Sequence, residues 1–228
     1  FFLKKGFSLG RAYEAKPVGG AVLPVVLAAL LVIGVATGAY AVSTEGPGSK
    51  HAPIILSLVV ALIIGALAQK SRMCFAGSIR DIILMKNFDL ISIIAALFAV
   101  MAVYNAATGS FHLGFSGQPI AHSQHLWNIL GMYVVGFAAV LAGGCPLRQL
   151  ILAGQGSSDS AVTFLGMLLG AAFAHNFGLV GAAAKAATET EPAVAGGPAA
   201  AGKIAVIVCI IVLFVIAGTN LRRKKTAK

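Results

Sequence analysis

The sequence contains few charged residues. Only 11% of its 228 residues are Asp, Glu, Lys or Arg, while 58% are hydrophobic and the mean hydropathy is +0.91. A water-soluble domain of this size needs more polar surface to cover its core. The apolar residues run in blocks of about 20, the length that crosses the hydrocarbon layer of a membrane. The composition therefore predicts an integral membrane protein built of helices, because lipid cannot satisfy unpaired backbone groups.

Cysteine is also scarce. The sequence has three, Cys74, Cys145 and Cys209, and no two of them form a CxxC pair, so neither a zinc ribbon nor a thioredoxin-type site is indicated. His122 and His125 are close enough to share a metal ion on a helical turn. No acidic or thiol partner stands near them in the sequence, so we predict no metal and no cofactor.

The apolar blocks predict an all-α protein with about six transmembrane helices. Two shorter apolar stretches follow the second and fourth blocks and predict two re-entrant or half helices. A segment rich in Ala, Pro and Gly, residues 182–202, is predicted to be a flexible loop. The six predicted spans are 21–42, 53–68, 90–108, 125–142, 161–180 and 202–219, and the two short helices are 73–85 and 146–153.

The net charge of +10 does not indicate a nucleic-acid partner, because the basic residues lie between and beyond the apolar blocks. Of the 17 Lys and Arg residues, only Lys50, Lys185 and Lys203 fall on one side of the alternating spans. This asymmetry predicts that both termini are cytoplasmic and that the remaining cations face lipid headgroups. The predicted organisation is a cytoplasmic segment or linker at 1–20, one helical transmembrane domain at 21–220 and a basic cytoplasmic tail at 221–228.

The chain also contains an internal repeat. Cys74 and Cys145 each follow a predicted span and open a short apolar stretch that contains an arginine. Asp89 and Asp159 then each head a new span, where we expect them to act as N-caps. Short helices at matching positions of two repeats mark the transport site of many carriers. The predicted repeat units are about 52–110 and 125–181.

The stretch "GGCPLRQ" places a thiol at the start of a helix. Pro146 suits the first helical position, so Cys145 falls at or beside the N-cap. Unpaired N–H groups and the positive end of the helix dipole meet there, which favours anions. Gly143 and Gly144 let the backbone approach a ligand closely. Arg148 is either a cytoplasmic anchor or a contact for the substrate.

The stretch "SRMCFAGSIRD", like "GGCPLRQ", contains a cysteine that is followed by an arginine. We expect Ser71 to cap a second short helix. Cys74, Ser78 and Asp81 then share one helical face by their i, i+4 and i+7 spacing. Gly77 has no side chain and therefore adds no bulk to that face. Ionisable and polar groups at membrane depth are costly, so such a face points to function.

Simpler interpretations stay open for several of these residues. Arg80 points away from that face, so that it neutralises Asp81 only through a bend or meets lipid phosphates. Arginines at such positions, here Arg72, Arg80 and Arg148, are more often cytoplasmic anchors than substrate contacts. A free cysteine is often a small buried hydrophobe, and Cys209, in the middle of an apolar block, is interpreted as a packing residue.

The segments "SRMCFAGSIRDIIL" and "AGGCPLRQLILAGQGSSDSAVTFLG" resemble the paired signatures of the YeeE/YedE family of membrane sulphur-compound transporters. The resemblance covers about residues 58–178 and is strongest to the YedE-like selenium transporters. It implies short helices that dip inward from both faces, with Cys74 and Cys145 relaying the anion through thiol hydrogen bonds. It also implies a missing N-terminal half with its own cysteine region, and a soluble sulphur carrier of the TusA type as a partner.

The main hypothesis is a bacterial inner-membrane transporter of a small sulphur- or selenium-containing anion. Two alternatives stay open. The first is a membrane-embedded sulphurtransferase that carries a persulfide on Cys145. The second is a subunit that completes a pore only with a partner half. The residues expected to bind the substrate are Cys74, Gly77, Ser78, Arg80, Asp81, Gly143, Gly144, Cys145 and Arg148.

Overall fold

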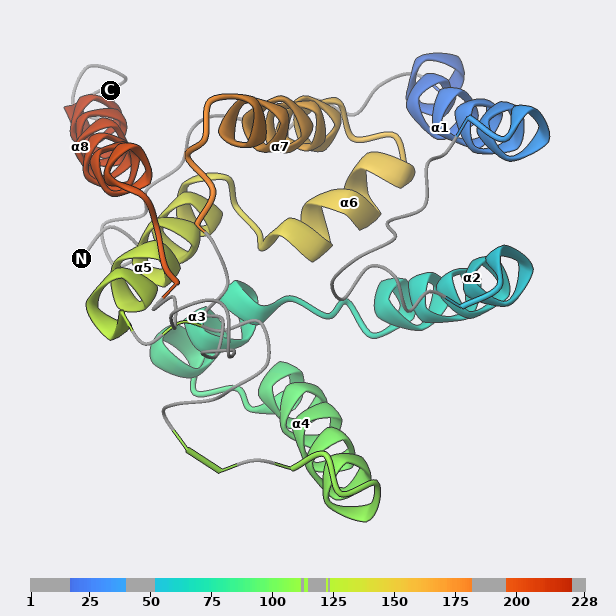
Figure 1. Cartoon of the computed structure of the whole chain (residues 1–228), viewed down its shortest axis with the longest axis horizontal. Helices are drawn as coiled ribbons and strands as arrows, with labels where there is room; N and C mark the ends of the chain where they lie inside the picture. The colour runs from blue at the N-terminus through green and yellow to red at the C-terminus, as the bar shows by residue number, and fades with distance from the viewer. Residues whose placement is uncertain are drawn as a thin grey trace, which may run out of the picture. The chain divides into compact units, whose positions relative to one another are not determined.

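The computed structural model describes residues 17–39, 52–111, 113–114, 122, 124–181 and 196–222 (Figure 1). Most of the predicted N-terminal segment, most of the predicted 182–202 loop and the end of the basic tail lie outside these residues. The described residues fold into eight α-helices and the turns that join them. The helices are α1 Pro17–Thr37, α2 Ile54–Lys70, α3 Phe75–Met85, α4 Asp89–Ala107, α5 His125–Leu141, α6 Pro146–Gly154, α7 Ser158–Asn176 and α8 Ala200–Arg222.

The helices confirm an all-α membrane fold. Five helical stretches of the described chain are long and apolar enough to cross a membrane, and two of these join a long helix to the short helix that follows it. The predicted fifth span corresponds to α7, which has 19 residues but is not among the five. Its ends explain the difference, because Asp159 lies in the first turn and His175 in the last.

The long helices bury very little of their apolar surface. None of the residues of α4 is buried, and large apolar side chains such as Phe98 and Val103 are about 70% exposed. The buried apolar residues are mostly small, and Ala68, Ala139 and Ala217 are examples. Small residues let membrane helices approach closely, while large apolar residues face the lipid.

The described helices divide into two compact units, and the first contains residues 75–145 and 167–222. In this unit α3 contacts α4 and α5, and α5 packs beside α8. Lys203 Nζ lies 5.5 Å from the Trp127 ring near the start of both helices, and Phe137 and Phe214 meet edge to face further along. The helices α5 and α8 therefore run parallel, as the predicted alternation of spans requires.

The second unit contains residues 17–74 and 146–166. Here α6 packs on both α1 and α2. The backbone of α1 also approaches the turn after α6, since a Cβ atom added to Gly20 would lie 3.0 Å from the Cα atom of Gly156. Gly156 has a φ angle of +93°, a conformation that only glycine adopts readily.

Each short helix packs on helices other than the long helix directly before it. The helix α3 follows α2 in the chain and packs on α4 and α5. The helix α6 follows α5 and packs on α1 and α2.

The approach of Gly20 to Gly156 gives the first prediction. Gly20→Ala adds a methyl group against backbone atoms that cannot move cheaply, so we expect a loss of about 1–3 kcal/mol in stability and a lower melting temperature in detergent. Gly65→Ala in α2 is the matched control, because nothing lies within 4 Å of its added Cβ atom. Equal melting temperatures for the two variants would contradict this packing of α1.

Candidate functional site

Two connections of four residues each, 71–74 and 142–145, join a long helix to the short helix that follows. Both have the hydrogen bonds of a Schellman motif, in which the turn pairs the last free carbonyls of the long helix. In the first joint Arg72 N–H donates to Gln69 O (3.2 Å) and Met73 N–H to Ala68 O (3.2 Å). In the second joint Gly143 N–H donates to Val140 O (3.3 Å) and Gly144 N–H to Ala139 O (3.0 Å).

The second residue of each four-residue connection has a left-handed backbone conformation. It is Arg72 (φ 53°) in the first joint and Gly143 (φ 78°) in the second. Glycine adopts this conformation without strain, whereas a side chain with a Cβ atom does not. The turn alone therefore accounts for Gly143, before any contact with a ligand is considered. Gly144 is buried beside the thiol that follows it.

Both cysteines lie directly before a short helix. Cys145 precedes Pro146, the first residue of α6, as predicted, and Cys74 precedes Phe75, the first residue of α3. The two side chains are 5% and 8% exposed. The expectation that Ser71 caps α3 is wrong. Ser71 ends α2 instead, where its Oγ donates to a carbonyl of the last turn, because the Schellman turn occupies the residues up to 73.

A buried polar face continues along α3 from Cys74. Ser78 is fully buried and Asp81 is 9% exposed, which confirms the predicted shared face. The Ser78 hydroxyl donates to the Phe75 carbonyl at 2.8 Å. Gly77 lies half-buried on the same helix. In a chain that exposes most of its large apolar residues, this burial of polar groups beside a thiol is notable.

The helix α6 has a matching face that the sequence analysis missed. Gln149 is 4% exposed and follows Cys145 by four positions, as Ser78 follows Cys74. Ala153 continues the buried face one turn later. The equal spacing of the two pairs was the signal available in the sequence, since it places a polar side chain one turn after each thiol.

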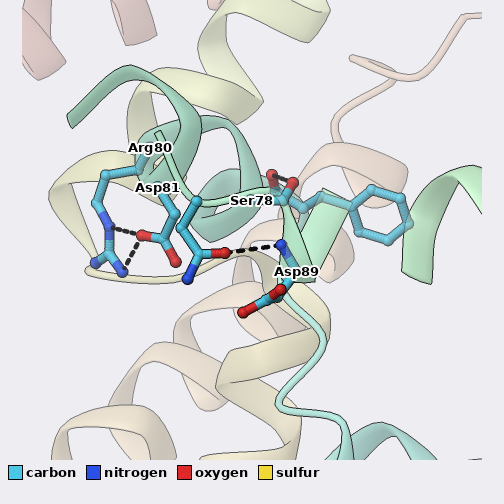
Figure 2. Close-up of polar contacts among 6 residues, drawn as sticks. Ser78, Arg80, Asp81 and Asp89 are labelled. Atoms are coloured by element: carbon cyan, nitrogen blue, oxygen red, sulfur yellow. Dashed lines mark hydrogen bonds and ion pairs between the residues drawn. The ribbon is translucent and has the colours of Figure 1, made fainter. Parts of the chain in front are cut away.

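The two arginines of the short helices have different partners. Arg80 Nε and Nη2 lie 2.9 and 2.8 Å from the same oxygen of Asp81, as Figure 2 shows. The guanidinium of Arg80 thus bends back and neutralises Asp81, which is the first of the two predicted alternatives. Arg148 Nη1 instead donates to Gln69 Oε1 of α2 at 3.2 Å. Within the described residues Arg148 meets no carboxylate at ion-pair distance.

The acidic residues at the starts of α4 and α7 lie inside the first turn rather than at the N-cap. The Asp89 N–H donates to the side-chain oxygen of Asn87 (2.7 Å; Figure 2), and the Ser160 N–H donates to Ser157 Oγ (3.5 Å). Ser157 therefore caps α7, while Asn87, which precedes the N-cap residue Phe88 of α4, accepts the first N–H of that helix. The carboxylate of Asp159 still lies where the helix dipole favours a negative charge.

A family model described as sulphur transport matches residues 70–228, which include both joints. The chain belongs to this sulphur transport family. It is similar to the thiosulfate transporter TsuA of Spirochaeta thermophila, with 30% identity over 115 residues that cover 48% of this chain and 33% of the relative. The thiosulfate transporter TsuA of Escherichia coli is 29% identical over 108 residues, 45% of this chain and 29% of the relative.

These matches cover about a third of the length of the two curated relatives. No solved structure matches the chain. The YeeE/YedE resemblance of the two cysteine segments is thus confirmed at the level of the family.

The Schellman turn at the second joint gives a prediction on stability. Gly143→Ala forces a Cβ atom into a left-handed conformation, so we expect a loss of about 1 kcal/mol and a lower melting temperature. Gly131→Ala in the middle of α5 is the control. It has open space and helical geometry, and we expect it to be neutral or stabilising. A Gly143→Ala protein as stable as Gly131→Ala would contradict the turn.

Proposed function

We propose that this chain forms part of a bacterial inner-membrane transporter for a small sulphur-containing anion such as thiosulfate, or for its selenium counterpart. One observation carries the proposal: a membrane protein of the sulphur transport family repeats the same joint twice, with a buried thiol directly before a short helix. Thiosulfate is the substrate class named in both curated relatives.

The joint suits an anion for a physical reason. The first N–H groups of a helix have no partner within the helix and carry the positive end of its dipole. Such a site attracts an anion without a buried lysine or arginine, and a thiol beside it adds a weak hydrogen-bond donor. Weak contacts in series favour passage over trapping.

The proposed binding residues extend from each thiol to its neighbours. In the first joint the anion would meet Cys74 and then the buried face of α3. In the second it would meet Cys145, the glycine turn before it and Arg148. The proposed set is Cys74, Gly77, Ser78, Arg80, Asp81, Gly143, Gly144, Cys145 and Arg148.

In our proposal, this chain forms only part of the transport path. The curated relatives are about three times as long as the matched region. A further half, or a partner subunit, would complete the pathway, and a soluble sulphur carrier of the TusA type would receive the product in the cytoplasm. The asymmetry of the basic residues supports a cytoplasmic location for both cysteine joints and for both termini of the chain.

The thiols are tested by substitution. We expect Cys145→Ala to abolish thiosulfate uptake and Cys74→Ala to lower it at least tenfold, because each removes a donor from the path. Uptake of labelled thiosulfate in cells that lack other carriers measures this, with protein amount in the membrane as the reference. Cys209→Ala is the control and should transport normally, since Cys209 is exposed in the middle of α8.

Normal uptake by Cys145→Ala would remove the thiol from the mechanism. A stable mass increase of one sulphur on Cys145 after exposure to thiosulfate would instead favour the sulphurtransferase alternative. Flux through the chain alone in liposomes would contradict the need for a partner half.

The orientation is tested by labelling. In a protein whose three cysteines are replaced by serine, we expect Ser110→Cys to react with a membrane-impermeant thiol reagent added to intact cells. Asn87→Cys, in the connection between α3 and α4, should react only after the cells are opened. The reverse pattern would overturn the predicted topology.

A further inference from the structure

We propose that Gln69 is a positioning residue that holds Arg148, with its positive charge uncompensated, as a direct contact for the transported anion. The inference rests on the proposed transport function. It adds a residue outside the two cysteine segments and assigns different roles to the two arginines of the short helices.

Arg148 lies at the start of its helix. It is the third residue of α6, so its cation lies in the turn that already carries the positive end of the helix dipole. Such a position is unfavourable for a cation that serves only to stabilise the helix, and the last turn would suit it better. An anion bound at this turn would make the position favourable for the cation of Arg148.

The partner of Arg148 is a neutral amide. The amide oxygen of Gln69 accepts a hydrogen bond from Arg148 Nη1 at 3.2 Å and orients the guanidinium, but it cancels none of its charge. In the other short helix Asp81 neutralises Arg80. Among the described residues, Arg148 therefore keeps the positive charge that the ion pair with Asp81 removes from Arg80.

Gln69 lies in a part of α2 that is held by the Schellman turn. Gln69 lies one residue before the end of α2, and its own carbonyl accepts the Arg72 N–H within the Schellman turn. The contact between α2 and α6 lies within one compact unit. The corresponding position of the second joint, 71 residues later, holds Val140, so the bond exists only once in the repeat.

Two variants of Gln69 in the full-length protein separate charge from support. Gln69→Glu keeps an acceptor for Arg148 and adds the missing carboxylate. We expect it to raise the half-saturating thiosulfate concentration about tenfold, with the maximal rate within about twofold of wild type. Gln69→Met removes the acceptor at similar volume and should raise the half-saturating concentration only about threefold, because the charge remains.

Gln155→Glu, at the other end of α6, adds the same charge away from Arg148 and should transport as wild type does. A purely structural role for the Gln69–Arg148 bond predicts the opposite order. Gln69→Glu would then match wild type, because it retains the bond, and Gln69→Met would lose protein and maximal rate together. That order would overturn the inference. The proposed function would still stand, provided that the wild type takes up thiosulfate. Absence of thiosulfate uptake by the wild type overturns the proposed function and the inference with it.

Discussion

Each long helix that precedes a thiol ends in the same Schellman turn, and the candidate site depends on that turn. The turn pairs the last carbonyls of the long helix, and the following helix begins directly after the cysteine. The thiol therefore lies beside backbone N–H groups that have no partner within their helix. A continuous helix through the same residues would use those N–H groups internally and leave no place for an anion.

The position of each short helix depends on packing against helices other than the long one before it. A helix of nine residues is too short to be stable alone, so its position must come from packing. For α6 that packing comes from α1 and α2, and Arg148 of α6 bonds to Gln69 of α2. The outer surfaces of the long helices contribute little to this support, since their large side chains face the lipid.

Much of this architecture could be predicted from the sequence, because long apolar blocks can do little else than form membrane helices. The start of α6 at Pro146 and the buried face of Cys74, Ser78 and Asp81 were predictable from one proline and a spacing of four and seven. The capping residues were not, since Ser71 and Asn87 take roles that depend on where the preceding helix stops.

The tertiary features were beyond sequence reasoning for a different reason. The bond from Arg148 to Gln69 joins residues that lie 79 positions apart, and no local pattern encodes it or the packing of α6 on α1 and α2. The pairing of Arg80 with Asp81 stayed one of two alternatives, because neighbouring residues on a helix normally point apart and only a bent guanidinium brings them together.

The most direct test of the account is an experimental structure of the full-length protein with thiosulfate bound. The account predicts density for the anion at the first turn of α6, in contact with the sulfur of Cys145 and the guanidinium of Arg148, and a second position beside Cys74. Both thiols enclosed in dry side-chain packing, with the anion bound elsewhere, would contradict it.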